Sequence, residues 1–141
     1  MNLSIVYWSG TGNTEAMANL IGEGAKEAGA NVSVKTTAEA SLDDIKNADV
    51  VALGCPSMGD EVLEECEFQP FMDSAMADLK GKKVAIFGSY GWGDGRWIRE
   101  WHENLTSNGC ILLNEGLMVN GAPAGDGEAE CKELGKTIAT A

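Results

Sequence analysis

The 141-residue sequence predicts an α/β fold, with helices on both faces of an open, doubly wound parallel sheet of five strands. Short apolar runs alternate five times with segments of helical periodicity, as in a chain of strand–helix units. The run 49–54 is apolar along its middle, which is typical of a parallel strand covered on both faces. Right-handed crossovers then leave only doubly wound strand orders. We expect a single domain over residues 1–141.

The first half of the chain is expected to hold three strands and two helices. The strands are the apolar or alternating runs 3–8, 31–36 and 49–54. The first helix has apolar side chains at helical spacing and ends at Gly29, because glycine readily takes the conformation that closes a helix. A brief helix over 41–48 is anchored by Leu42 and Ile45.

The second half is expected to add two strands and three helices. Apolar side chains at helical spacing mark the helices over residues 68–79, 97–105 and 131–138. The fourth strand covers residues 84–88. The fifth is expected to be interrupted or extended, because two apolar runs, 110–113 and 116–119, are separated by a polar pair.

Residues 9–14, with the sequence SGTGNT, join the first strand to the first helix. The glycines let the backbone turn tightly, and the other side chains add hydroxyl and amide donors. The start of the helix adds free N–H groups and the positive end of its dipole. Such a loop is typical of an anion site, most often for phosphate. No lysine follows Gly12, which excludes a P-loop, and Glu15 stands where a dinucleotide fingerprint needs a third glycine.

Two further glycine-rich loops follow the third and fourth strands, over residues 55–61 and 89–95. Because the carboxyl ends of parallel strands lie at one edge of a sheet, these loops are expected to meet the first one. They carry Met58 and Trp92, whose side chains pack well on a planar ring. A phosphate at one end and a planar ring at the other indicate a mononucleotide ligand.

The sequence resembles flavodoxins of the short-chain type found in anaerobic bacteria. Three segments carry the resemblance: IVYWSGTGNT from residue 5, MGDE from residue 58 and FGSYGWG from residue 87. The similarity runs over essentially the whole chain. It implies a flavodoxin-like sheet with strand order 2-1-3-4-5 and non-covalently bound FMN at the point where that order reverses.

The resemblance also implies roles for individual residues. Residues 9–14 would hold the FMN phosphate, and Met58 and Trp92 would pack on opposite faces of the isoalloxazine ring. Glu61 would accept a hydrogen bond from the N3–H group of the ring. The complete set of implied FMN-binding residues is Ser9, Gly10, Thr11, Gly12, Asn13, Thr14, Ser57, Met58, Gly59, Asp60, Glu61, Ser89, Tyr90, Gly91, Trp92, Gly93 and Asn120.

Two positions depart from the pattern of the family. Ser57 stands where alanine is expected, and the loop that starts at Asn120 is smaller and more glycine-rich than usual. Ser57 and Ser89 would meet the ribityl chain or the ring edge, and Asn120 would meet a ribityl hydroxyl. The carbonyl of Gly59 is the candidate to face the protonated N5 of the semiquinone, because glycine has no Cβ to resist the peptide flip.

The family implies a low-potential one-electron carrier, not an enzyme, that replaces or parallels ferredoxin while its FMN cycles between semiquinone and hydroquinone. Acidic residues in or after the ring-binding loops would disfavour the anionic hydroquinone and lower the second potential. They are Asp60, Glu61, Glu64, Glu65, Glu67 and Asp94. Ferredoxin-dependent oxidoreductases, such as hydrogenases, are the implied partners. The net charge of −12 favours basic docking surfaces and argues against nucleic acid or an anionic membrane as partner.

A flavin-dependent reductase is the alternative that stays open, because it would share the FMN loops. It would also need a substrate pocket, and no insertion in the chain is large enough to cover the ring. A receiver-type signalling domain is excluded, because Gly54 and Cys55 stand where it needs a phosphate-accepting aspartate. The four cysteines form no C-x-x-C pair, and no run spans a bilayer or reads as a signal peptide. We expect a monomeric cytoplasmic protein without a metal.

Overall fold

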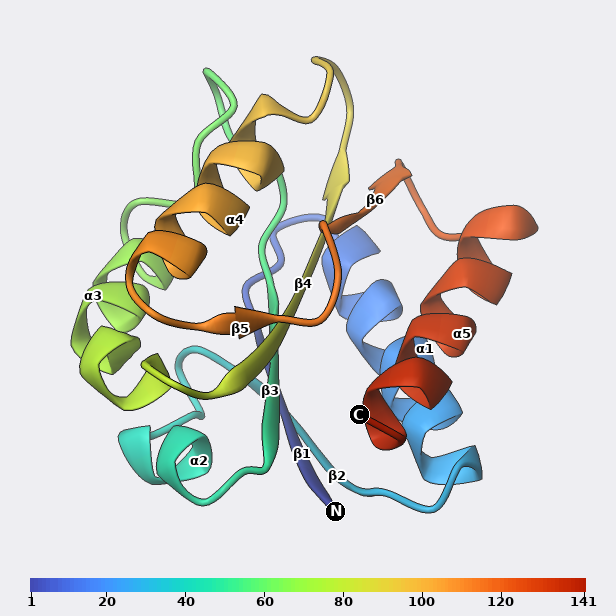
Figure 1. Cartoon of the computed structure of the whole chain (residues 1–141). Helices are drawn as coiled ribbons and strands as arrows, with labels where there is room; N and C mark the ends of the chain where they lie inside the picture. The colour runs from blue at the N-terminus through green and yellow to red at the C-terminus, as the bar shows by residue number, and fades with distance from the viewer.

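Strands and helices alternate in the computed structural model, which describes residues 1–141 (Figure 1). In chain order the elements are β1 (Asn2–Tyr7), α1 (Asn13–Glu27), β2 (Asn31–Thr36), α2 (Leu42–Lys46), β3 (Val50–Gly54), α3 (Phe68–Leu79), β4 (Lys83–Tyr90), α4 (Arg96–Ser107), β5 (Ile111–Leu112), β6 (Leu117–Asn120) and α5 (Asp126–Ala139). The strands form one sheet in the order β2-β1-β3-β4-β5, with β6 also paired to β4. The predicted fold class and strand order are confirmed. No helix has the length and apolar character that crossing a lipid bilayer requires.

Alternate residues of each strand enter opposite cores, so both faces of the sheet are covered. In β1, Ile5 packs with Met17 of α1 and other apolar residues of α1 and α5. The neighbouring Val6 faces the other way, into a core that includes Phe68 of α3 and Trp101 of α4. Figure 1 shows α1 and α5 on one side of the sheet and α2, α3 and α4 on the other. Full burial of a side chain of this size contributes about 1.5–3 kcal/mol.

Helices α1 and α5 cross closely because each has a glycine at the crossing. A Cβ atom built on Gly24 would lie 2.0 Å from the carbonyl oxygen of Lys132. One built on Gly135 would lie 2.0 Å from the carbonyl oxygen of Ile21. Backbone atoms cannot move aside as side chains can, so these two positions accept no side chain without separating the helices.

The predicted interruption of the fifth strand is confirmed, and one side chain fills the gap. Strand β5 pairs with Lys83 and Val84 at the start of β4, whereas β6 pairs with residues 87–90 at its end. Between them, Asn114 Oδ1 accepts a hydrogen bond from the N–H of Ile86 (3.1 Å). Its Nδ2 donates to the carbonyl of the same residue (3.0 Å). The amide side chain thereby satisfies the backbone of β4 where no strand reaches it.

Two predicted boundaries at the loop ends of the strands are wrong. Strand β4 extends to Tyr90, so Ser89 and Tyr90 belong to the strand and not to the loop that follows it. The reason is β6, which gives β4 a hydrogen-bonding partner as far as Tyr90. At the other boundary, β1 ends at Tyr7, and Trp8 is the first residue outside it.

Candidate functional site

Three loops meet at the carboxyl ends of β1, β3 and β4, as predicted. Thr14 Oγ1, at the start of α1, lies 2.9 Å from Ser89 Oγ at the end of β4, and both hydroxyls are buried. Ser57 links the second loop to the same strand, because its N–H donates to the carbonyl of Ser89 (3.0 Å). The contact of Thr14 with Ser89 brings together segments that are 75 residues apart in the sequence.

A cavity of about 280 Å³ opens between these loops. Its lining residues are Trp8, Gly10, Thr11, Asn13, Pro56, Ser57, Met58, Ser89, Tyr90, Gly91 and Gly121. A cavity of similar size, about 310 Å³, lies at the other end of the sheet and is lined by residues such as Asn2, Ser33 and Asp44. The second cavity has no glycine in its lining and no aromatic ring, so the first is the better candidate for binding a mononucleotide.

The first loop presents a cluster of unused backbone donors. Ser9 Oγ accepts hydrogen bonds from the N–H groups of Gly12 (3.1 Å) and Glu15 (3.3 Å), which fixes the turn. Gly12 has φ +94°, a backbone conformation that glycine takes without strain. The N–H groups of residues 10, 11, 13 and 14 donate to no group of the chain. Together with the N-terminal end of α1, these donors are available to an anion without any basic side chain.

The second loop contains a tight hairpin over residues 58–62. Met58 and Val62 exchange two backbone hydrogen bonds of 2.9 and 3.0 Å. Gly59 has φ +45°, a conformation that glycine takes without strain, and three residues, 59–61, separate the paired residues Met58 and Val62. A Cβ atom built on Gly59 would meet no atom within 4 Å, so this backbone borders open space. Glu61 is the one residue other than glycine with positive φ, at +58°.

The carboxylate of Glu61 holds this hairpin against the third loop. Its side chain is buried, with only 7% of the residue exposed. Oε1 accepts hydrogen bonds from the N–H groups of Asp94 (3.1 Å), Gly95 (3.1 Å) and Arg96 (3.3 Å). These groups stand at the start of α4, where the positive end of the helix dipole favours an anion. Oε2 accepts no hydrogen bond within 3.5 Å, and the nearest cation, Arg96 Nε, is 3.8 Å away.

A second buried carboxylate, Glu64, holds the end of the same loop. Its oxygens accept hydrogen bonds from the N–H groups of Cys66 (2.9 Å), Glu67 (2.7 Å) and Phe68 (2.8 Å). Burial opposes ionisation, but these three donors together lower the pKa of Glu64 below its usual value. Glu64 is therefore a buried, charged carboxylate that fixes the loop, and not an exposed acidic side chain.

Three other ionisable groups around the site have shifted pKa values. Burial raises the pKa of the Cys55 thiol to about 12, so this side chain stays protonated at neutral pH. Burial and the hydrogen bond to Glu15 raise the pKa of Tyr7 to about 12. The guanidinium of Arg99 lowers the pKa of Asp94, which therefore remains charged.

The structure places the predicted site residues in three groups. Eight of them line the cavity: Gly10, Thr11, Asn13, Ser57, Met58, Ser89, Tyr90 and Gly91. Seven others border it in the same loops without lining it: Ser9, Gly12, Thr14, Gly59, Asp60, Glu61 and Gly93. The remaining two are Trp92, which is 64% exposed, and Asn120, an exposed residue at the end of β6. Neither lines the cavity.

Three lining residues were not predicted: Trp8, Pro56 and Gly121. The indole of Trp8 lies over the first loop, because a Cβ atom built on Gly10 would come within 3.0 Å of its ring. The position of Trp8 at the end of a strand, next to Ser9, could have indicated from the sequence that it lines the site. Pro56 and Gly121 adjoin Ser57 and Asn120, so their proximity to the site follows from the same loops.

A doubly wound sheet with a phosphate-type loop after β1 and glycine-rich loops after β3 and β4 defines a mononucleotide-binding α/β protein. A sequence model of the flavodoxin family matches residues 5–135. The chain is 48% identical to a flavodoxin of Clostridium beijerinckii over 137 residues, which are 97% of this chain and 99% of that one. The solution structure of two-electron-reduced Megasphaera elsdenii flavodoxin is 47% identical and covers 99% of each chain, with a TM-score of 0.92. The chain belongs to the flavodoxin family.

Membership of this family confirms the predicted cofactor and activity. Flavodoxins bind FMN and carry electrons at low potential, and they are electron-transfer proteins, not enzymes. The flavin-dependent reductase is therefore set aside. The chain is an FMN-binding electron carrier that exchanges electrons with redox partners.

Proposed function

We propose that the residues at this site bind FMN with its phosphate on residues 9–14 and its ring between the hairpin 58–62 and the loop 91–95. The chemistry of the donor set supports the phosphate end, since the unused N–H groups of the first loop suit a buried dianion. The open space beside Gly12, Gly59 and Gly91 supports the fit, because a Cβ atom built on any of them meets nothing within 4 Å.

The ring-binding roles follow from the same placement. Met58 would pack on one face of the ring, and Trp92 would close over the other, since its exposed indole is free to cover a ligand. Glu61 can serve two purposes, because Oε1 is committed to the start of α4 while Oε2 is free to accept from the ring. Ser57 and Ser89 lie in the cavity lining, where they would reach the ribityl chain. Asn120, which does not line the cavity, would reach a ribityl hydroxyl from its edge.

Bound FMN supplies the one-electron chemistry, and the hairpin would provide a hydrogen-bond acceptor near its N5 position. Gly59 would turn its carbonyl toward N5 when that atom carries a proton. Positive φ at Gly59 and the open space around it support this role, since the peptide between Gly59 and Asp60 can rotate without a steric clash at Cβ.

The finer identity of the partners is also part of the proposal. The net charge of −12 supports docking on basic surfaces of ferredoxin-dependent oxidoreductases, by a monomer of one domain over residues 1–141. Four cysteines are free, and three of them are buried, which is consistent with a cytoplasmic protein.

The observation that carries the proposal is the hairpin with Gly59 at positive φ beside the cavity. Gly59→Thr should lower the yield of the one-electron-reduced form during stepwise reduction with dithionite, followed by visible absorption. A β-branched residue strongly disfavours positive φ and would resist the peptide rotation.

Gly81→Thr is the matched control for this experiment. Gly81 also has positive φ (+80°) and no atom within 4 Å of a built Cβ, but it lies between α3 and β4, away from the cavity. The control should reduce stability and leave the yield unchanged. A wild-type yield in Gly59→Thr would show that the hairpin does not contact N5.

A further inference from the structure

Arg96, the first residue of α4, reaches across to the hairpin of the second loop. Its Nη2 donates a hydrogen bond to the carbonyl oxygen of Asp60. Its Nε lies 3.8 Å from Glu61 Oε2 and 3.9 Å from Glu100 Oε1. One guanidinium therefore contacts both the backbone and the carboxylate of the segment that faces the proposed ring position.

The hydrogen bond from Arg96 holds the peptide between Asp60 and Glu61, which is adjacent to the peptide between Gly59 and Asp60 that is proposed to rotate. The carbonyl of Asp60 belongs to the peptide between Asp60 and Glu61, and the preceding peptide carries the carbonyl of Gly59. While Arg96 holds the first of these carbonyls, rotation in the turn is confined to the peptide of Gly59. The side chain of Arg96 is half exposed, so the hydrogen bond from Arg96 to Asp60 does not depend on packing in the core.

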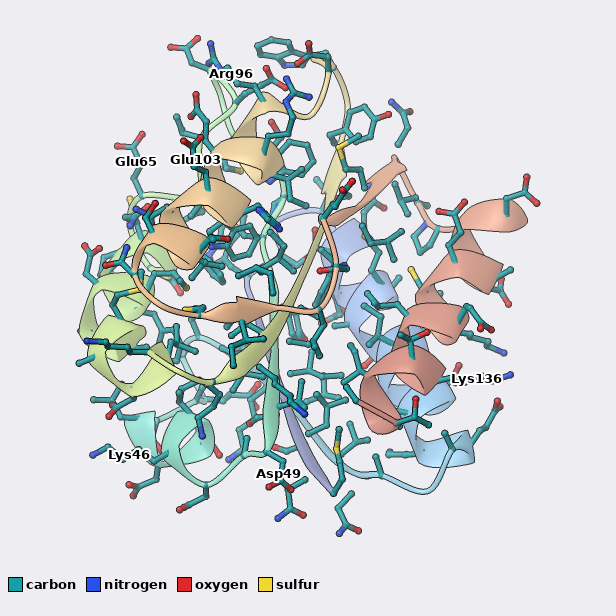
Figure 2. All side chains as sticks on the ribbon, in the orientation of Figure 1. Lys46, Asp49, Glu65, Arg96, Glu103 and Lys136 are labelled. Carbon is teal, nitrogen blue, oxygen red and sulfur yellow. The ribbon has the colours of Figure 1, made fainter.

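Arg96 also brings a positive charge to an acidic rim. This rim consists of Asp60 in the hairpin and Asp94 in the loop 91–95, both exposed, and the buried carboxylate of Glu61 adjoins it. The other arginine of α4, Arg99, does not contact the hairpin; it donates to the carbonyl (2.7 Å) and the carboxylate (3.1 Å) of Asp94 in the loop 91–95. Figure 2 shows Arg96 at the end of the molecule where these loops lie, whereas Lys46 and Lys136 lie at other edges.

We propose that Arg96 is a positioning residue of the FMN site, which anchors the Asp60 carbonyl and stabilises the fully reduced, anionic cofactor relative to its less reduced forms. The inference rests on the proposed placement of the hairpin against the ring. The effect of Arg96 is opposite to that of the acidic rim, whose negative charges disfavour the fully reduced, anionic cofactor.

The test compares Arg96→Gln with Arg99→Gln, which removes an equal charge from the same face of α4 without touching Asp60. The second reduction potential of bound FMN measures the affinity for the fully reduced cofactor relative to the one-electron-reduced cofactor. In Arg96→Gln this relative affinity should fall about three- to tenfold, where tenfold corresponds to about 59 mV. Arg99→Gln should change it less, and Arg96→Lys should restore part of the loss.

A second measurement uses the protein without FMN. The N–H of Val62 is hydrogen-bonded to Met58 across the hairpin, so its hydrogen exchange reports how firmly the turn is held. Exchange should be at least threefold faster in Arg96→Gln than in wild type, and close to wild type in Arg99→Gln.

Equal potentials in the two variants would overturn the inference, because only a general charge effect would remain. Unchanged exchange of Val62 in Arg96→Gln would overturn the anchoring of Asp60. These failures are distinct from a failure of the proposed site, which would show itself first as a wild-type yield in Gly59→Thr.

Discussion

Two buried carboxylates, Glu61 and Glu64, show how single residues shape the second loop. Both are 7% exposed, and each accepts three backbone hydrogen bonds at the start of a helix. Glu61 ties the loop to α4, and Glu64 ties it to α3. Their negative charges are therefore used to satisfy N–H groups that would otherwise lack acceptors, and the strained backbone at Glu61 is held by these contacts.

Glu64→Gln should destabilise the protein by about 1.5–3 kcal/mol at neutral pH, because hydrogen bonds to a charged group are replaced by weaker ones. The folded-state pKa of Glu64 is lowered, so its stabilising effect is complete above the unfolded pKa of about 4.3 and is lost as the pH falls. Urea unfolding of the FMN-free protein at a series of pH values should thus show the free energies of unfolding of wild type and Glu64→Gln converging below about pH 4. Glu65→Gln, which alters an exposed neighbour, serves as the control and should change the free energy of unfolding little. A difference between wild type and Glu64→Gln that stayed constant at all pH values would contradict the lowered pKa of Glu64.

At the scale of elements, the crossing of α1 and α5 is the most restrictive contact in the fold. Gly24→Ala and Gly135→Ala should each cost about 2–3 kcal/mol in urea unfolding, since the added Cβ meets backbone oxygen at 2.0 Å. Alanine would otherwise favour the helix by about 1 kcal/mol.

Gly127→Ala separates these two effects. It lies in the same helix as Gly135, and a Cβ built there meets only the side chain of Val119, at 3.2 Å and beyond. This variant should stay within about 1 kcal/mol of wild type, because a side chain can give way. If all three variants unfolded alike, the close crossing would not be the cause.

The helices and strands were largely predictable, because each carries its own periodicity, and the strand order followed from the family resemblance. The interrupted fifth strand was also visible as two apolar runs. What could not be predicted is the set of contacts between a side chain and a distant backbone. Asn114 pairs with Ile86, and Glu61 with the start of α4, across 28 and 33–35 residues. No local pattern encodes such contacts, since they depend on how the loops are placed by the finished sheet.

At the scale of the whole molecule, charge is the dominant surface property. With 22 acidic and 10 basic side chains, the protein should transfer electrons to a basic acceptor such as cytochrome c at a rate that falls with ionic strength. Screening at 0.1 M salt limits the range of interaction between exposed charges to about 10 Å, so most of the decrease in rate should occur below that salt concentration. Stopped-flow rates of the reduced protein at increasing salt check this, and a flat profile would argue against electrostatic docking.

The unused N–H groups of residues 10, 11, 13 and 14 bear on the sequence of events when the cofactor arrives. These donors are already in place around a turn fixed by Ser9, whereas Trp92 is still 64% exposed. In the proposed binding mode, the donors for the phosphate are preformed, whereas the aromatic side chain that would cover the ring is still exposed to solvent. If residues 9–14 hold the phosphate as proposed, we expect the phosphate to be captured before the ring is enclosed, and the protein to select FMN over riboflavin by that group.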